Sequence, residues 1–399
     1  MAAEVSDPTI KELNALVSSV AALLTQLEAT LTGLTKETEA SKASTETPRA
    51  DRDQINCLKL AADSADLVKA HTTRLSLLII TEPFTPTAIS KVLRELVSGA
   101  VPSIATAAEL CDGERFTYFF SQAMRLKCHS LIRELLAFVL KIPSDGKVLT
   151  EEQKHTATDN SGKGSLAMTG VLWSICDDLK KFAITGVGAY LVKRMDETRL
   201  TLKDIVEELT EWQEESEDQD DDDDDEGGEA ADFDSAVDIN DSRANSPGAQ
   251  DTHNTAQSLL DDLMGSAKSI PRDDPQKIRP RLAQCLRSLK LCMIMCQAVS
   301  KRRLKTLPEF PPKDAQVSKT LQNVFRFFNV LPQKYEDVVM AFYELDPTVI
   351  DENLKKAGTE LIHAIEPLKS PLQGGSSDEF TAWFEKFKTE LETAYSAQY

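Results

Sequence analysis

The sequence predicts an all-α protein made of two antiparallel helical bundles joined by a disordered acidic linker. Apolar residues recur every three or four positions through both halves of the 399-residue chain, which is the period of an amphipathic helix. We find no stretch with the strict alternation of a half-buried strand. Long stripes separated by short polar segments are typical of antiparallel bundles, in which each helix turns one face to a shared core.

A strongly acidic segment separates the two halves. Residues 211–241 contain 17 Asp and Glu and no Lys or Arg, so the remainder of the chain has a net charge of only −3, against −20 for the whole. A segment this polar cannot bury enough apolar surface to offset the conformational entropy that the chain loses when it becomes ordered. It could bind a basic partner or act only as a spacer. We expect a disordered linker over residues 216–277, between an N-terminal bundle of residues 1–215 and a C-terminal bundle of residues 278–399.

Six helices are expected in the N-terminal bundle. The first carries an unbroken apolar stripe from Ile10 to Leu34. That stripe fits either a helix packed within its own bundle or a coiled-coil dimer, because both require the same period. Thr85 is the expected N-cap of the third helix, with Pro86 in its first turn and an interruption at Pro102. The other expected segments are helices over residues 58–79, 124–142, 168–179 and 191–212, and a polar loop over residues 143–165.

Five helices are expected in the C-terminal bundle. Asp346 with Pro347 supplies the cap and first turn of the fourth, and Ser376 with Glu379 fits a capping box for the fifth. The expected helical segments are residues 278–299, 317–331, 335–345, 347–365 and 376–391.

Composition narrows the classes of function. The longest unbroken apolar runs, such as residues 77–80 and 135–140, fall far short of the ~20 residues needed to cross a membrane, so no membrane span is expected. The first residues have neither the basic start nor the apolar run of a secretory signal. The seven cysteines include no Cys-x-x-Cys pair, which favours a reducing compartment, the cytoplasm and nucleus. The negative charge argues against direct nucleic-acid binding.

Signatures of catalysis are weak, so we expect no enzyme, no cofactor and no metal. The Gly-Val-Gly sequence at residues 186–188 lacks the third glycine of a dinucleotide-binding loop. Cys128 lies in an apolar stripe, which favours an inert buried thiol over a nucleophile. Cys292 and Cys296 lie one helical turn apart and could hold a soft metal, but their place in an apolar stripe favours core packing.

Short segments outside the apolar stripes are candidates for recognition. An apolar island in the linker could fold as a helix on docking into a groove, or could be the first helix of the second bundle. A basic segment near residue 300 could be read by an import receptor or a cyclin docking groove, or could only complement a helix dipole. Ser246 precedes a proline in the linker and is a candidate phosphorylation site. The island comprises Leu259, Leu260, Leu263 and Met264, and the basic segment comprises Lys301, Arg302, Arg303, Leu304 and Lys305.

A tryptophan-containing helix and the segments around the linker carry a family resemblance. Residues 171–176, Val-Leu-Trp-Ser-Ile-Cys, place Trp173 and Cys176 three positions apart. A helix over residues 191–208 then enters the acidic linker. Beyond the linker come a helix studded with basic residues, 286–292, and an acidic, aromatic segment, 335–343. In order and spacing these segments resemble the cyclin-D-binding protein family, also called cyclin-D-interacting or GCIP-like proteins, over about residues 55–345.

The resemblance implies a two-lobed, all-helical adaptor similar in build to vinculin- and catenin-type bundles. Such proteins are associated with binding D-type cyclins and helix-loop-helix regulators and with restraining cell-cycle progression, in nucleus and cytoplasm. We therefore expect protein partners of these types, with Trp173 and Cys176 as structural signatures of the family. The alternative is a cytoskeletal or adhesion adaptor of the vinculin or catenin kind, whose partner is actin or a membrane-associated helix.

Overall fold

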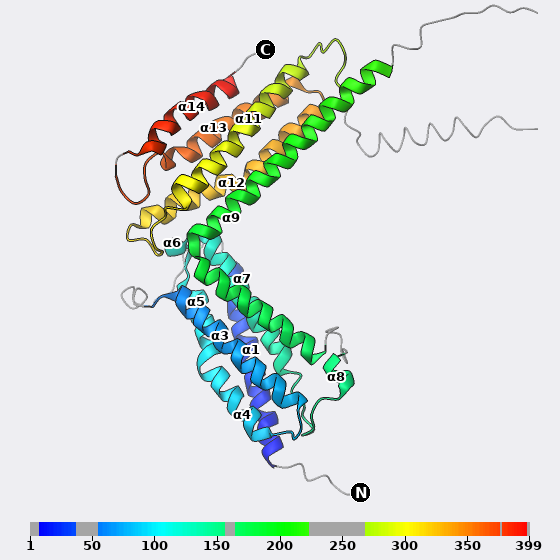
Figure 1. Cartoon of the computed structure of the whole chain (residues 1–399), viewed down its shortest axis with the longest axis vertical. Helices are drawn as coiled ribbons and strands as arrows, with labels where there is room; N and C mark the ends of the chain where they lie inside the picture. Colours follow the sequence, from blue (N-terminus) through cyan, green and yellow to red (C-terminus); the bar gives the residue numbers. More distant parts are fainter. Residues whose placement is uncertain (1–7, 37–54, 156–163, 223–267, 376, 397–399) are drawn as a thin grey trace, which may run out of the picture. The chain divides into compact units, whose positions relative to one another are not determined.

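The computed structural model describes residues 8–36, 55–155, 164–222, 268–375 and 377–396 of the chain (Figure 1). Every regular element in these ranges is a helix, so the predicted all-α class is confirmed. The helices divide into two compact units. The first unit contains residues 1–193 and 304–322, and the second contains residues 194–303 and 323–399.

The division between the units falls inside helix α9, Ser165–Asp222, and not at the acidic segment. At Gly186 the backbone of α9 leaves the helical region, with φ 71° and ψ −175°, a conformation that is open to glycine because it has no Cβ. The helices expected over residues 168–179 and 191–212 are the two parts of α9. The unit boundary at residue 193 therefore differs from the expected boundary at residue 215, because periodicity alone does not reveal that one helix serves two units.

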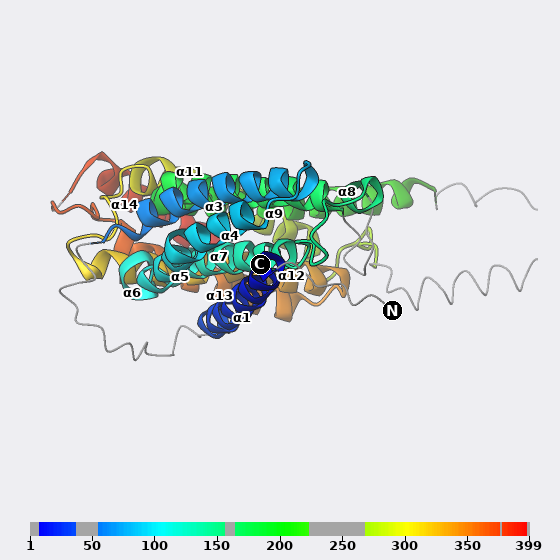
Figure 2. The same cartoon turned by 90° about the horizontal axis from the view of Figure 1, so that it is seen from below.

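In the first unit, helices α1 and α3 each pack against two other helices. Helix α1 packs against α7 and α4, and α3 packs against α5 and α4. In Figure 2, helices α4, α5 and α7 lie between α1 and α3. The helices of this unit, besides the first part of α9, are α1 (Pro8–Lys36), α3 (Cys57–Ile80), α4 (Pro86–Glu95), α5 (Val101–Leu110), α6 (Gly113–Phe116), α7 (Tyr118–Val139) and α8 (Glu151–His155).

Helix α1 is held within its own unit by polar contacts as well as by its apolar stripe. The side chains of Arg125 and Gln122 on α7 donate to the carbonyl oxygens of Leu34 and Thr35, at 2.9 and 2.5 Å. These carbonyls lie at the end of α1, where a helix has no internal donors for them. The structure thus places the Ile10–Leu34 stripe in an intramolecular interface, the first of the two arrangements compatible with its period.

The helix starts predicted around the first prolines agree with the structure. Thr85 immediately precedes α4, and Pro86 is its first residue, although the Thr85 side chain forms no capping hydrogen bond. A π-helical turn, η1 (Leu96–Ala100), follows α4, and Pro102 lies in the first turn of α5. The predicted interruption therefore takes the form of a change of helix type immediately before the proline, whose ring is tolerated in a first turn.

The second unit packs the last helices of the chain against one another. Helix α11 contacts α13 and α14, which also contact each other. The second part of α9 runs parallel to α12, because Arg194 donates to Asn329 at 2.9 Å and, further along both helices, Tyr343 donates to Glu208 at 2.7 Å. The elements are α11 (Ile278–Val299), the π-helical turn η3 (Ser300–Leu304), α12 (Ala315–Tyr343), α13 (Pro347–Ile365), η4 (Glu366–Leu368) and α14 (Glu379–Ser396).

Helix α12 replaces two predicted helices with one. The segments expected over residues 317–331 and 335–345 join across Pro332, which lies inside the helix. A proline removes one backbone hydrogen bond and clashes with the preceding turn. Here Phe328, Leu331 and Tyr335 continue one fully buried face across it, and that burial outweighs the local cost.

Both described ends of the predicted linker pack in the second unit. Ser216 is buried, and its hydroxyl accepts a hydrogen bond from the Ile270 amide at 3.3 Å. The Trp212 indole donates to the carbonyl of Lys268 at 3.2 Å. Ser216 and residues 268–270 therefore pack in the second unit although the expected linker range includes them, because Ile270 provides an apolar anchor that is 1% exposed.

Two helices are long and apolar enough to cross a membrane by length and mean hydropathy alone. They are Pro8–Lys36 and Ile278–Leu304, each with a mean hydropathy of 1.3. The sequence analysis expected no membrane span because it considered only unbroken apolar runs. Mean hydropathy is an average over a window that also contains polar residues, so it can be high without such a run. In the most apolar 18-residue stretch of each helix, 50% of Ile278–Leu304 and 17% of Pro8–Lys36 is buried in the structure.

Candidate functional site

Polar contacts join α3 to the first part of α9 along an antiparallel seam. The Trp173 indole donates to the Thr73 hydroxyl at 3.0 Å. One turn further along α9, Asp177 accepts from Lys69 at 2.6 Å. Successive contacts move toward the C-terminus of α9 and toward the N-terminus of α3, so the two helices are antiparallel. Lys180 and Asp66, 2.7 Å apart, continue the series, so charges of opposite sign alternate along the seam.

The two signature residues lie on different faces of α9. Cys176 is 1% exposed, and burial raises the pKa of its thiol to about 12, so it is an inert core side chain. Trp173 is 39% exposed and touches α3 through its indole nitrogen. Cys176 therefore serves the interior, while Trp173 belongs to the seam and presents part of its ring to solvent.

Exposed apolar side chains accompany Trp173 along the seam. Leu166, Trp173 and Ile184 are spaced 7 and 11 residues apart, which places them on one face of α9. On α3, Leu77 is 56% exposed and lies one turn beyond Thr73. Leu166 is 37% exposed and Ile184 is 69% exposed. We call Leu77, Leu166, Trp173 and Ile184 the seam surface.

A groove adjoins the seam surface in the first unit. It has a volume of about 950 Å³ and lies between the start of α3, the turn of α9 at Gly186, and residues 304–310. Ile184 belongs both to the groove and to the seam surface. A Cβ at Gly188 would lie 3.1 Å from the Leu304 carbonyl oxygen, so the glycines at residues 186–188 serve a turn and a close backbone approach.

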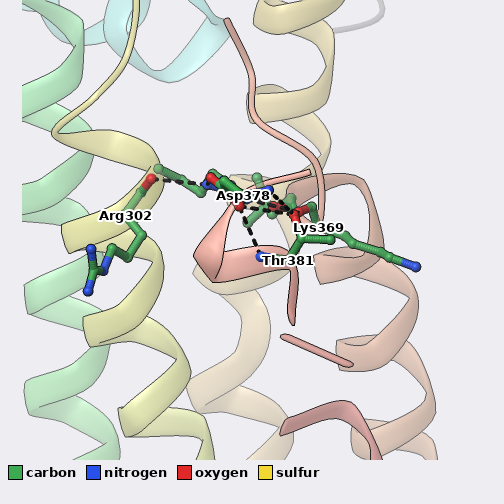
Figure 3. A network of polar contacts seen from close by, with 6 residues as sticks. Arg302, Lys369, Asp378 and Thr381 are labelled. Atoms are coloured by element: carbon green, nitrogen blue, oxygen red, sulfur yellow. Dashed lines mark hydrogen bonds and ion pairs between the residues drawn. The ribbon is translucent and has the colours of Figure 1, made fainter. Parts of the chain in front are cut away.

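The basic segment is divided between surface and interior. Lys301, Arg302 and Lys305 are exposed, whereas Arg303 and Leu304 are buried. Figure 3 shows the Arg302 side chain pointing away from a network of polar contacts in the second unit, in which the Arg302 backbone carbonyl accepts a hydrogen bond from Arg303. An import receptor or a cyclin groove would meet three cations of the segment but neither the Arg303 guanidinium nor the Leu304 side chain.

Arg303 is the centre of that network. Its guanidinium forms a bidentate ion pair with Asp378, at 2.7 and 3.1 Å, and donates to the carbonyls of Leu368 and Lys369 at 2.7 and 2.8 Å. It also lies 4.2 Å from the ring centre of Phe380. A buried arginine needs such partners, because an unpaired charge in the interior is strongly unfavourable.

Asp378 is also the N-cap of α14. Its carboxylate accepts from the Thr381 amide at 2.9 Å, and the Thr381 hydroxyl accepts from the Asp378 amide at 3.1 Å. The expected capping box of Ser376 and Glu379 is therefore wrong, since Glu379 is already the first residue of α14 and Ser376 lies outside the described residues. Hydrogen bonds from Arg303, and then from Thr381, hold the pKa of the Asp378 carboxyl well below its ordinary value.

A polar cluster in the interior of the second unit joins α11, α12 and α14. The hydroxyls of Tyr335 and Tyr395 are 2.5 Å apart, and the Tyr335 hydroxyl also contacts Ser288 at 3.1 Å. The sulfur of Cys292 lies 3.3 and 3.5 Å from the two hydroxyls. Burial raises the pKa of Cys292 and of both tyrosines. Sequence spacing gave no signal for this cluster, because its four members come from three separate helices.

The two cysteines considered for a metal do not form a ligand set. Cys292 contacts tyrosine hydroxyls, and Cys296 is buried with its thiol pKa raised by desolvation. In the described parts of the chain no group of three His, Cys, Asp or Glu side chains is placed to hold a metal ion. Cys128 is likewise buried, and its pKa is raised to about 12.

The remaining candidates fall elsewhere in the chain. Ser246 and the apolar island of Leu259, Leu260, Leu263 and Met264 lie outside the described residues.

Comparison with known protein families gives a match to the part of the chain that contains the seam. Residues 61–215 match the family model "Grap2 and cyclin-D-interacting, N-terminal". This part of the chain is similar to a Grap2 and cyclin-D-interacting N-terminal domain. The match confirms the resemblance predicted from the sequence, and the matched residues include every member of the seam surface. It continues through the second part of α9, which packs in the second unit.

A relative extends the similarity beyond this domain. An uncharacterized protein of Schizosaccharomyces pombe is 22% identical over 334 residues, which are 83% of this chain and 82% of the relative. The similarity therefore includes both sides of the acidic segment.

Proposed function

We propose that this protein is a non-enzymatic interaction protein that binds a cyclin or a helix-loop-helix regulator through the seam surface. In this role it modulates cell-cycle progression or transcription, in the cytoplasm and nucleus. The observation that carries the proposal is the position of the seam surface, with four large exposed apolar side chains, among the residues that match the cyclin-D-interacting family model. Clustered exposed apolar groups are characteristic of protein interfaces, and tryptophan is enriched among the residues that dominate binding energy.

The seam suits a binding surface because its backbone is held in place. The ion pairs Lys69–Asp177 and Asp66–Lys180 join the two helices along the same seam as the apolar groups. A surface that is already ordered loses little conformational entropy when a partner docks.

The state of the ionisable groups in the second unit supports a role without catalysis. Burial raises the pKa of Cys292, Tyr335 and Tyr395, so all three are neutral at physiological pH. A neutral and mutually hydrogen-bonded cluster stabilises a core and supplies neither an activated nucleophile nor a charged acid or base.

Capture of a purified D-type cyclin, and separately of a helix-loop-helix factor, by the full chain tests the proposal. The double variant Leu166→Ser with Ile184→Ser should reduce capture by about tenfold or more. The matched control is Leu126→Ser with Leu140→Ser, which alters one side chain on α7 and one at its C-cap, 56% and 62% exposed in the same unit. Equal capture by the two double variants would remove the seam surface as the site. Actin co-sedimentation without capture of either partner would instead favour the adhesion-type adaptor.

A further inference from the structure

A glycine interrupts the row of side chains on the seam surface. Gly170 is exposed on the first part of α9, one turn after Leu166 and one turn before Trp173. A Cβ added at Gly170 would meet nothing within 4 Å. The space over this residue, between two exposed apolar side chains, is therefore open.

Contacts between α3 and α9 show which residue of α3 borders this space. The hydroxyls of Thr169 and Ser76 lie 2.9 Å apart in the interior, so these two residues face each other across the seam. Gly170 and Leu77 are the next residues along the two helices. In an antiparallel pair, residues that follow a facing pair turn to the same side, because both helices are right-handed. Leu77 thus borders the open space, which suits a side chain of a third helix as a hole suits a knob.

Two turns further along α9, the seam carries more exposed negative charge than positive charge. The side chain of Asp177 is 58% exposed and that of its partner Lys69 is 35% exposed. Asp66 is 51% exposed and its partner Lys180 is 41% exposed. Asp63 is also exposed and lines the groove together with Asp66. A carboxylate that contacts one cation keeps lone pairs for a second donor, so this part of the seam is complementary to a basic partner.

The seam surface and the groove together match the length of one helix. Leu166 and Ile184 are 18 residues apart, which corresponds to about 27 Å along α9. Ile184 also lines the groove, whose walls include the start of α3 and residues 304–310. Side chains of a third helix can pack into the channel between two antiparallel helices. A partner helix of about 18 residues would therefore cover the seam surface and reach the groove.

We propose that the partner contributes a basic amphipathic helix of about 18 residues, which places an apolar side chain over Gly170 and Lys or Arg side chains beside Asp66 and Asp177. The assignment rests on the proposed function, since it specifies the chemistry of the partner at the same surface. Lys and Arg can make both kinds of contact, because their aliphatic stems pack on apolar groups while their charged ends reach carboxylates.

Titration calorimetry of the full chain with three synthetic peptides of about 18 residues tests the proposal. The first peptide has leucines along one helical face, lysines beside that face and glutamine elsewhere. The second has glutamate in place of lysine, and the third has the residues of the first in scrambled order. At about 0.15 M salt, where long-range attraction between charges is screened, the first should bind at least about tenfold more tightly than either of the others. Equal affinity for the first peptide and either control would overturn the proposal.

Variants of α9 locate the peptide on the seam. Gly170→Leu fills the open space and should weaken binding of the lysine peptide about tenfold or more. It should not lower the melting temperature, because leucine has a higher helix propensity than glycine. The control is Gly33→Leu on α1, where a Cβ also meets nothing within 4 Å, and its binding should equal that of the wild type. Asp177→Asn should reduce the preference for lysine over glutamate, whereas Asp178→Asn, at the next exposed position of α9, should not.

Unchanged binding by Gly170→Leu would overturn the proposal, because the peptide would then lie elsewhere on the chain. Self-association of the chain that Gly170→Leu abolishes would also overturn it, by assigning the surface to a second copy. Failure to capture a cyclin or a helix-loop-helix factor, with the lysine peptide still bound at the seam, would remove the proposed function and leave the basic-helix site. Capture that the Leu166→Ser, Ile184→Ser variant abolishes but Gly170→Leu does not would remove the basic-helix site and leave the proposed function.

Discussion

The guanidinium of Arg303 and the carboxylate of Asp378 form a bidentate ion pair that also completes the N-cap of α14. Arg303 is 3% exposed, while the Asp378 side chain is 38% exposed. The pair links the turn after α11 to the start of the last helix, 75 residues later. A cation that the sequence offered as a recognition signal is therefore part of the second unit's core.

Replacing Asp378 should destabilise the protein more than replacing an acid at the surface. Asp378→Asn removes the charge opposite buried Arg303, and we expect a loss of about 2 kcal/mol in the free energy of unfolding, less than for a fully buried pair because Asp378 is partly solvated. Urea denaturation monitored by circular dichroism measures it. Glu390→Gln is the control. The side chains of Glu390 and its partner Arg287 are 64% and 58% exposed, so this ion pair should contribute less than about 0.5 kcal/mol to the free energy of unfolding. Similar losses for the two variants would contradict the core role of Arg303.

The same pair should make stability depend on acid pH. The pKa of Asp378 in the folded protein lies below its ordinary value of 3.8, so the unfolded chain takes up the proton first as pH falls. The stabilisation is fully present above about pH 5 and is lost as pH falls through 3.8 toward the folded pKa. Urea midpoints of the wild type and Asp378→Asn should therefore converge between pH 5 and pH 2.5. A constant difference over that range would show that the pair does not titrate as expected.

A glycine of α13 should resist substitution because of an aromatic ring on α14. A Cβ at Gly358 would lie 2.3 Å from the ring of Tyr395, so the ring would have to move out of its place in the buried cluster. We expect Gly358→Ala to destabilise by about 1–3 kcal/mol through overpacking, which exceeds the ~1 kcal/mol that alanine gains over glycine in a helix. The control is Gly170→Ala in α9, where a Cβ meets nothing within 4 Å. That variant should be neutral or stabilising, and thermal melts of both distinguish the outcomes.

Two substitutions of Trp173 should separate its structural contact from its proposed binding role. Trp173→Phe removes the 3.0 Å hydrogen bond to Thr73 but keeps an exposed ring, so we expect a loss of about 1 kcal/mol in stability and little change in cyclin capture. Trp173→Ala should lower both, because it also removes the ring. Capture that follows stability alone across the two variants would reduce Trp173 to a structural role.

Much of the helical layout could be predicted because it is encoded locally. The stripe from Ile10 to Leu34 coincides with α1 and the stripe over residues 58–79 with α3, since each satisfies one period over many turns. Predictions failed where packing overrode a local signal. The expected division between residues 331 and 335 is bridged by the buried face of α12 across Pro332. Ser376 fitted a capping motif whose place Asp378 takes.

The candidate sites were harder to predict because they depend on pairing between helices. Trp173 was identified from the sequence, but its contact with Thr73 and the apolar groups beside it required the antiparallel seam. The exposure of Lys301 and Arg302 against the burial of Arg303 required the position of α14.

The sequence by itself determined which segments are helical and which face of each is apolar, because these properties arise between residues at most a few turns apart. Only the tertiary structure decided that α9 serves two units, that Arg303 is an interior cation, and that the hydroxyls of Tyr335 and Tyr395 meet. Such facts depend on how helices pair, and the free energy of pairing comes from contacts between residues that are distant in the chain.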